Sequence, residues 1–542
     1  MKKLIALASV LALCLSLAAC GGSAAPATTA AGGTSTAAAG GSTTAAAATT
    51  AAGSGKEKVL VVAASQDPVH FNSNATTDAT GYPRFNIFSN LFNRTQGGDT
   101  INDLVKDYEI SADGLTYTMQ LHENILWHDG TPFSSEDVKF TYETHLREKG
   151  VQVERFQAIE TIECPDANTV IFKLSHVDAD LRVSMVNVDI LPKHLYEGTD
   201  WLENPANQSP IGTGPYKFVE HKKGQSITLV ANLDYFKGVP EIDKLIYKII
   251  PDANTMVQAY LNGEIDVMDA AAAVEFGSMP LIEADPGSEY VVTMGSSRQY
   301  VVPNQARGIF DDLKIRQAIA LAVDKQAMVD LAHKGYAYPC VGFYTPTVPW
   351  AYTEDFRMPD RDVATANQLM DEAGFPADAS GVRIKDMEIV IFEFAAFHDL
   401  ATVLQSNLKE IGIECSITML EYSAWSERME KGDFDLSIIS GNHGPSPANI
   451  KTRLITDGSM NYGGYSNTAL DKLFDDVAAE SDEAARGKIM YEIQRILHDD
   501  MPVMYLTEWC GVSVVKDYVK NHYSFDQHNL PWGCFFLADI VD

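Results

Sequence analysis

The side chains in this sequence with the most evident chemistry are suited to binding a small molecule. Arg298 carries a planar guanidinium that can hold a carboxylate through two parallel hydrogen bonds, although a solvated surface arginine is the commoner situation. Tyr344 and Trp350 lie in a proline-rich segment and can line a pocket wall. Asn442 and His443 follow an apolar run, and both side chains can donate or accept hydrogen bonds. For His443, a surface-loop histidine is an equal alternative.

Sequence signatures of catalysis and of metal binding are absent. The chain has no HExxH, no GxSxG, no P-loop and no GxGxxG before a helix. Its acidic pairs, such as Glu136-Asp137, fall at predicted helix starts, where carboxylates favour the helix dipole, or on solvated faces. The spacing of His122 and His128 does not indicate a metal site. We therefore predict that the protein is not an enzyme, an extracellular hydrolase included, and that it uses no metal or cofactor.

The cysteines form no metal-binding or redox motif. Of the seven, Cys14 and Cys20 belong to the N-terminal segment. The others contain no CxxC pair and are Cys164, Cys340, Cys415, Cys510 and Cys534. Their odd number leaves at least one without a disulfide partner, and no pairing follows from the sequence. We expect most of them to be buried thiols that pack as small apolar side chains.

Strands and helices alternate after residue 56 and must position the binding side chains. Alternating or continuous apolar runs predict strands over 58–63, 114–121, 168–174, 227–230, 244–250 and 413–419. Apolar residues at helical spacing predict helices over 134–149, 252–262, 312–332, 365–373, 399–411 and 482–499. This order predicts an α/β protein with mixed sheets.

The N-terminus has the pattern of a secretory signal. Lys2 and Lys3 precede an apolar stretch, Leu4 to Ala19, which is shorter than the about 20 residues of a comfortable membrane span. Its end, Leu17-Ala18-Ala19-Cys20, resembles the bacterial lipobox, in which the cysteine is acylated and becomes the mature N-terminus. We predict a signal peptide and lipobox over 1–20, lipidation at Cys20, and anchoring on the extracytoplasmic face of the cell membrane. The Ala-, Thr-, Ser- and Gly-rich residues 21–55 predict a disordered tether.

Composition and charge restrict the class of the remaining chain. Residues 56–542 are numerous enough for two or more domains, and a hydrophobic content of 46 % supports a sizeable core. A formal net charge of −32 argues against nucleic-acid binding, because phosphate neutralisation needs clustered Lys and Arg. The simplest consequence of this charge is solubility.

A series of motifs resembles one protein family. The block from Asp113 to Val138 contains DGLTYT and WHDGTPF. It is followed by GTGPY at 212–216, NGEID at 262–266, DLKIRQAIALAVD at 312–324, DEAGF at 371–375, LKEIGI at 408–413 and NYGGYS at 461–466. The series is similar to the family 5 extracellular solute-binding proteins, the binding components of peptide and nickel importers. Most of these residues form turns or start helices, so they indicate the fold more than the site.

The resemblance implies a clamshell of two lobes, like the periplasmic binding proteins, within the α/β class with mixed sheets. The first lobe would be discontinuous, comprising 56–297 and 506–542, and the second would be 298–505. Strand crossings near 294–302 and 504–510 would form a hinge, and a ligand that contacts both lobes would stabilise the closed form. The implied partners are the permease and ATPase subunits of an ABC importer, to which a monomeric, lipid-anchored binding protein delivers its solute.

The resemblance also implies where ligand-contacting residues lie: after the first strand, at the first crossing, in the proline-rich loop, and around the strand and loop near 425–450. They are Ser65, Asp67, Phe71, Asn72, Arg298, Tyr300, Asn304, Tyr344, Trp350, Trp425, Asn442 and His443. Trp425 resembles an aromatic residue that many relatives place near the ligand, with a core tryptophan as the alternative.

One departure from the family bears on the ligand. In peptide-binding relatives, an acid in the loop after a GDFD-like element, here 432–435, pairs with the peptide α-amino group. In this chain no acid lies between Asp435 and Asp457. A buried ammonium without a carboxylate partner is costly. We therefore predict a peptide or peptide-like ligand without strict recognition of a free N-terminus. A nickel chelate, an oligosaccharide, another polar solute, or a sensing role are the alternatives.

Overall fold

The computed structural model describes residues 56–75, 82–272, 274–444, 446–526 and 528–541. The chain divides into two units, Met1–Gly55 and Lys56–Asp542, and the second of these, the body, contains all described residues. The predicted signal peptide, the lipidation at Cys20 and the predicted tether lie outside the described residues. Among the described helices, none is long and apolar enough to cross a bilayer.

A mixed sheet of ten strands runs through the body, in the order β14, β13, β15, β12, β16, β11, β1, β10, β9, β8. Their bounds in that order are Ile413–Leu420, Ile384–Phe392, Leu436–Asn442, Ser288–Pro303, Met504–Lys516, Val267–Met268, Val59–Ala64, Lys244–Ile249, Ser226–Ala231 and Tyr216–Lys222. β1 is parallel to β10 and β11, and β13 is parallel to β14 and β15. Parallel strands are covered on both faces, which explains apolar runs such as VLVVAA in β1.

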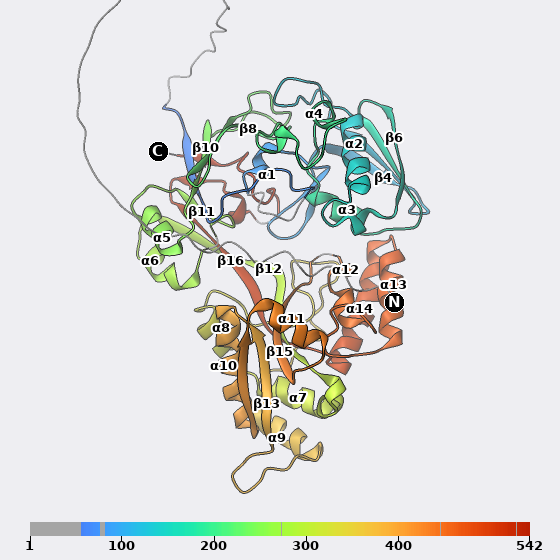
Figure 1. Ribbon diagram of the computed structural model, residues 1–542, viewed down its shortest axis with the longest axis vertical. Coiled ribbons are helices and arrows are strands. Elements are labelled where there is room, and N and C mark those ends of the chain that lie inside the picture. The colour runs from blue at the N-terminus through green and yellow to red at the C-terminus, as the bar shows by residue number, and fades with distance from the viewer. Residues whose placement is uncertain (1–55, 76–81, 273, 445, 527, 542) are drawn as a thin grey trace, which may run out of the picture. The chain divides into compact units, whose positions relative to one another are not determined.

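Two long strands, β12 and β16, connect the two ends of this sheet. They pair with each other along both halves, but the register breaks between Met294 and Arg298. Before the break, β12 pairs with the part of β16 that also pairs with β11. After the break, residues 297–303 pair with β15. The break divides the sheet between a first lobe, which contains β1 and β8–β11, and a second lobe, which contains β13–β15 (Figure 1).

Strand direction brings two sets of strand ends toward each other at this break. β16 runs from the second lobe into the first, and β11 is antiparallel to it, so β1, β10 and β11 run toward the second lobe. β12 is antiparallel to both β15 and β16, so β13, β14 and β15 run toward the first lobe. In open α/β sheets, ligands bind outside the carboxyl ends of the strands. The topology therefore places two potential binding edges opposite each other.

The first lobe has a second, antiparallel sheet, ordered β4, β5, β7, β6. These strands span Val105–Ile110, Thr116–Leu121, Thr169–Leu174 and Ile159–Asp166. Helix α2 (Ser135–Arg147) begins with a capping box, in which the Asp137 carboxylate accepts a hydrogen bond from the Ser134 backbone N–H at 2.9 Å. Leu181 in α3 (Leu181–Ser184) packs in the same hydrophobic cluster as this sheet, so α3 belongs to the first lobe.

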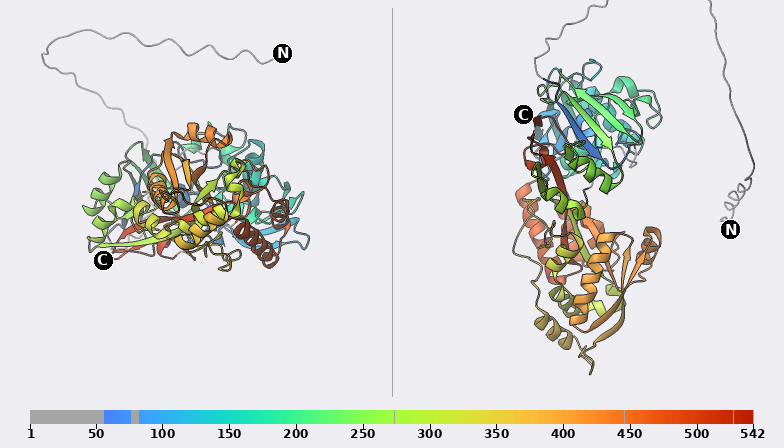
Figure 2. Two further views of the ribbon diagram at one scale, coloured as in Figure 1. Left: turned by 90° about the horizontal axis from the view of Figure 1, so that it is seen from below. Right: turned by 90° about the vertical axis from the view of Figure 1, so that its left-hand side faces the viewer.

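The remaining elements cover the two lobes (Figures 1 and 2). Those of the first lobe are α1 (Arg84–Ile87), α4 (Lys193–Tyr196), α5 (Ala253–Leu261), α6 (Met279–Glu283) and the short strand pairs β2–β3 (Phe92–Arg94, Thr100–Asn102) and β17–β18 (Val519–Lys520, Asp539–Ile540). The second lobe has α7 (Leu313–Ala322), α8 (Lys325–Ala332), α9 (Val363–Glu372), α10 (Ala395–Glu410), α11 (Tyr422–Glu430), α12 (Ala448–Leu454), α13 (Thr468–Ala479) and α14 (Glu483–Asp500).

One helix prediction is wrong. The segment 312–332 forms two helices, α7 and α8, instead of one. The backbone is extended at Val323, and the Asp324 carboxylate caps α8 by accepting a hydrogen bond from the Ala327 N–H at 2.9 Å. The apolar period continues across this break because both helices pack on the same core.

Candidate ligand-binding site

A buried ion pair lies at the register break of the crossing strands. Arg298 in β12 is opposite Glu508 in β16, and their side chains are 0 % and 2 % exposed. Arg298 Nε is 3.4 Å from Glu508 Oε2, but the two atoms are not aligned as a hydrogen bond. Within the described residues, Arg298 Nε and Nη2 and Glu508 Oε2 have no hydrogen-bond partner. Burial raises the pKa of the Glu508 carboxyl, and the charge of Arg298 opposes that shift. Buried charges without partners are costly, so polar ligand groups would be stabilised here.

The loop between α8 and α9 lies beside this pair. The Tyr344 hydroxyl is buried and has no hydrogen-bond partner in the part of the chain that the structure describes. Its pKa is raised by burial, and the charges of Arg298, Asp180 and Arg486 also act on it. Tyr344 is therefore near both the buried ion pair and Asp180. Burial likewise raises the pKa of the Cys340 thiol in the same loop, with the Glu508 charge as a further cause.

His443 lies next to these groups at the end of β15, fully buried. Its Nδ1 is 2.8 Å from the Gly441 carbonyl oxygen, so Nδ1 carries the proton, and Nε2 accepts from the Tyr505 hydroxyl at 3.0 Å. Burial, with the nearby Arg298 charge, lowers the pKa of His443 well below its usual value. His443 is therefore neutral, and its two ring nitrogens are already engaged. The neighbouring Asn442 is exposed, and its Oδ1 accepts a hydrogen bond from the Gly444 N–H at 2.7 Å.

The two lobes also touch outside the crossing strands. The Asp180 carboxylate, at the start of α3, accepts hydrogen bonds from Arg486 Nη2 in α14 and from the Ser446 hydroxyl, each at 2.5 Å. The Arg486 guanidinium also lies over the Trp350 ring, 4.7 Å from its centroid. Arg155 Nη2 donates to Asn449 Oδ1 at 3.2 Å. These contacts connect the first lobe to α14, to α12 and to Ser446 just before α12.

Aromatic side chains gather at the carboxyl ends of the second-lobe strands. Phe394 follows β13, Tyr422 follows β14, and Trp509 lies in β16 at the register break. Their exposed fractions are 38 %, 60 % and 38 %. The rings of Phe394 and Trp509 stack at 5.6 Å, and Phe392 contacts both Phe394 and Tyr422. None of these three residues was predicted from the sequence as a ligand residue. Only Tyr422, shortly after the strand predicted at 413–419, carried a usable signal, because no strand was predicted before Phe394.

The predicted Trp425 lies behind this group. It is 4 % exposed, its rings contact Phe392, Tyr422 and Tyr462, and its Nε1 donates to Ser437 Oγ at 3.3 Å. It is thus a core residue that supports the exposed aromatic side chains.

The four residues predicted after β1 are not gathered around the buried ion pair. Ser65 lies at the carboxyl end of β1, and its hydroxyl donates to the Ala271 carbonyl at 3.1 Å. Asp67 binds His221 Nε2 at 2.6 Å and accepts from the Gly224 N–H. Phe71 is in the first-lobe core, and Asn72 is buried with its amide near the Trp201 carbonyl. Only Ser65 and Asp67 therefore lie near the edge that faces the second lobe.

The other two predicted residues of the first crossing are also buried, Tyr300 near Arg298 and Asn304 at the far end of β12. Tyr300 is 2 % exposed and contacts the rings of His443 and Tyr505. Asn304 Nδ2 donates to the carbonyls of Gly432 and Phe434, both at 2.9 Å. The Asn304 side chain therefore joins β12 to the turn before β15 and stabilises the fold there.

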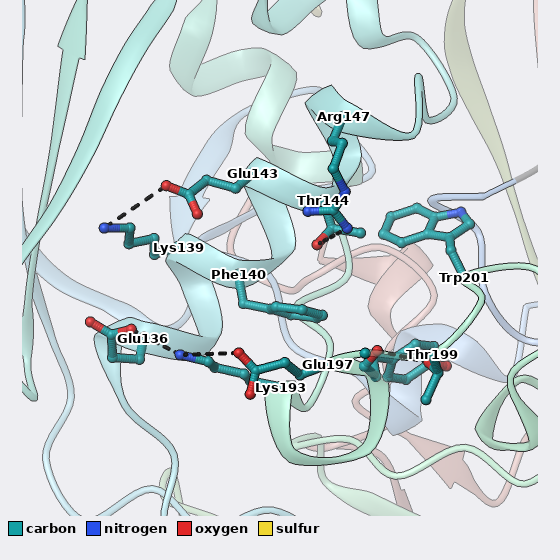
Figure 3. Close-up of a pocket in the computed structure, with 12 residues that line it drawn as sticks. Glu136, Lys139, Phe140, Glu143, Thr144, Arg147, Lys193, Glu197, Thr199 and Trp201 are labelled. Carbon is teal, nitrogen blue, oxygen red and sulfur yellow. Dashed lines mark hydrogen bonds and ion pairs between the residues drawn. The ribbon is translucent and has the colours of Figure 1, made fainter.

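Two pockets differ in their relation to this site. One of about 400 Å³ is lined from both lobes, by Tyr108 and Arg182 of the first and by Trp350 and Arg486 of the second. Another of about 430 Å³ lies within the first lobe, between α2 and the segment around α4 (Figure 3). Lys193 in that pocket forms ion pairs with Glu136 and Glu197, so these three charges compensate one another. Within the described part of the chain, no group of three or more His, Cys, Asp or Glu side chains could hold a metal ion.

Comparison with known proteins identifies the class of this architecture. A sequence model of the bacterial extracellular solute-binding proteins, family 5 (middle region), matches residues 99–461. The chain belongs to this family. The matched range includes β12, Arg298 and most of the second lobe, and family 5 proteins of this kind are extracytoplasmic binding proteins of ABC importers.

Relatives within family 5 extend over almost the whole body. The oligopeptide-binding protein AppA of Bacillus subtilis is 30 % identical over 477 residues, which are 82 % of this chain and 85 % of AppA. The ABC transporter substrate-binding protein CtaP of Listeria monocytogenes has a similar structure, with a TM-score of 0.80 at 26 % identity over 90 % of this chain and 100 % of that chain. AppA of Bacillus subtilis in complex with a nonapeptide gives a TM-score of 0.67 at 26 % identity, with the same coverage. The two-lobed fold predicted from sequence is thus confirmed, and these relatives are binding proteins.

Proposed function

We propose that the protein captures a peptide or peptide-like solute between its two lobes and delivers it, unaltered, to the permease and ATPase of an ABC importer. The observation that carries the proposal is the pair of strand-end edges that face each other at the register break, where buried polar atoms of Arg298, Tyr344 and Glu508 lack partners. The family membership of the chain and the peptide-binding relatives support it.

The lobes of this proposal comprise 56–297 with 506–542, and 298–505. The register break in β12 supports the first boundary, because the partners of that strand change there. A ligand that contacts both edges binds the closed arrangement better than the open one and shifts the population toward it.

Arg298 is the proposed partner of a ligand carboxylate. Because its side chain is fully buried, a carboxylate reaches it only when some of the groups that cover it move aside. The loop after β15 offers no acid for a ligand ammonium, so the N-terminus of the ligand contributes little. Asn442 at the exposed end of β15 and Ser65 at the end of β1 are placed to bind backbone groups of an extended ligand.

Anchoring and location complete the proposal. Acylation at Cys20 holds the protein on the extracytoplasmic face of the membrane, and residues 21–55 act as the tether of a monomeric binding protein. Such a tether raises the effective concentration of the body at its membrane partner.

Titration calorimetry with matched tripeptides tests the peptide proposal. N-acetylated tripeptides with a free carboxylate should bind as well as unmodified ones, whereas C-terminal amides should bind at least tenfold more weakly. Dipeptides with free N-termini should bind weakly, and submicromolar dissociation constants for several of them would contradict the argument from the missing loop acid. Absence of binding for every peptide, with a thermal shift from a sugar or metal chelate, would assign another solute.

A further inference from the structure

Phe394, Tyr422 and Trp509, called here the edge aromatics, form an exposed apolar group on an otherwise acidic protein. Leaving a large aromatic side chain exposed to water is unfavourable compared with burying it. Contiguous exposed apolar groups therefore often mark binding sites. The stack of Phe394 on Trp509, with an interplanar angle of 23°, fixes both rings in place. A ring that is already ordered loses little entropy when a ligand covers it.

The edge aromatics lie where the topology places a ligand. Phe394 and Tyr422 lie two residues after the ends of β13 and β14, which run toward the first lobe. Trp509 is in β16 between Glu508, which pairs with Arg298, and Cys510, which pairs with Met294. The group therefore spans from the second lobe to the crossing strands, along the same edge as Asn442. A docking surface that is unrelated to ligand binding would not be expected to coincide with this edge.

The group is also supported from behind. Phe392 makes edge-to-face contacts with Tyr422 and with Trp425, and Trp425 makes one with Tyr462. Trp425 is also hydrogen-bonded to Ser437. Such a supporting layer holds the outer rings at fixed positions, as a specificity site requires. Exposed aromatic faces bind other aromatic rings by offset or edge-to-face contact, and they bind aliphatic groups less specifically.

We propose that the edge aromatics form a subsite that selects ligands with an aromatic side chain. The inference rests on the proposed function, since it names the side-chain class of the ligand bound at that same edge. Trp509 and Tyr422 make direct contact with the ligand ring, and Phe394 holds Trp509 in position.

The test uses calorimetry on the full-length protein. It compares alanine pentapeptides that carry one phenylalanine, tryptophan or cyclohexylalanine with the all-alanine pentapeptide. The wild-type protein should bind the phenylalanine and tryptophan peptides about tenfold more tightly than the all-alanine peptide, and cyclohexylalanine should recover only part of this gain. Trp509→Leu and Tyr422→Leu should each remove most of the preference. Phe525→Leu, at a first-lobe ring that is 44 % exposed, is the matched control and should leave the preference intact.

Each outcome has a defined meaning. Equal affinity of the wild-type protein for aromatic and all-alanine peptides overturns the proposal, as does a preference that survives Trp509→Leu in a protein with unchanged thermal stability. If no pentapeptide binds, the peptide function fails, and the subsite is then tested with N-acetyltryptophanamide alone. Saturable binding of that probe to the wild type and its loss in Trp509→Leu would preserve the subsite, whereas no binding would overturn it.

Discussion

The contact between Asp180 and Arg486 should control how the two lobes sit relative to each other, and Arg486→Gln is the perturbation that tests this. Asp180 and Arg486 are 9 % and 7 % exposed, and the carboxylate has charged and hydroxyl donors at 2.5 Å. The substitution removes the charged donor and leaves Ser446 as the only interlobe donor to that carboxylate among the described residues.

The size of the effect depends on whether the lobes can separate. In a rigid interface, removing one partner of a buried pair costs about 3–5 kcal/mol, because the remaining charge stays buried. If the lobes rotate about the crossing strands, water reaches Asp180 and the loss is limited to that of the contact itself. A hydrogen bond to a charged group contributes about 1.5–3 kcal/mol, so the equilibrium constant for forming the contact should fall by about ten- to a hundredfold.

Small-angle scattering and thermal unfolding distinguish these two cases. With movable lobes, Arg486→Gln should change the radius of gyration while the melting temperature falls little. Arg495→Gln, at an exposed position on the same helix that pairs with Glu492 and Asp499, should change neither quantity. Unchanged scattering, together with destabilisation of the full 3–5 kcal/mol, would refute the reasoning and show that the lobes are fixed at this contact.

Three further perturbations have definite expected outcomes. Cys20→Ser should move the protein from the membrane to the soluble fraction, and continued membrane retention would count against lipidation. Asn304→Ala leaves the Gly432 and Phe434 carbonyls without a donor, so unfolding should cost about 1–3 kcal/mol less while ligand affinity stays unchanged; a large affinity loss would assign Asn304 to the ligand. Burial lowers the pKa of His128 to about 4. The unfolded chain binds this proton below about pH 6.5, whereas the folded protein does so only near pH 4. The free energy of unfolding should therefore decrease as the pH is lowered from about 6.5 to 4, by at most about 1.4 kcal/mol per pH unit. In His128→Asn, the free energy of unfolding measured with urea should depend less steeply on pH over this range.

The fold was largely predictable because its elements carry strong local signals. The capped start of α2 at Ser134 and the apolar run of β1 were predicted within two residues of their observed bounds. The break between α7 and α8 was missed because a single cap at Asp324 interrupts an apolar period that both helices share. The continuous sheet was also not predictable, because the pairing of β12 with β15 and β16 depends on contacts distant in sequence.

The site was less predictable than the fold. Arg298 was singled out for its chemistry, but its burial against Glu508 depends on the register of two strands more than 200 residues apart. Phe71 and Trp425 were predicted as ligand residues, and the structure places both in hydrophobic clusters. Whether an aromatic side chain is exposed, as Trp509 is, depends on how neighbouring elements end, which the sequence does not state.

Gly295, in the register break, has a consequence for mechanics. Among the described residues neither it nor Ser296 has a register partner in the strand ladder, although the Ser296 carbonyl accepts a hydrogen bond from the His443 N–H at 2.7 Å. A Cβ at Gly295 would lie 2.8 Å from the Trp509 carbonyl oxygen. The hydrogen-bonded strands on either side are stiff, so we expect backbone torsion to be easiest at Gly295. A side chain at position 295 would push the crossing strands apart where the proposed lobes meet, and we expect the strand pairing within each half to remain intact.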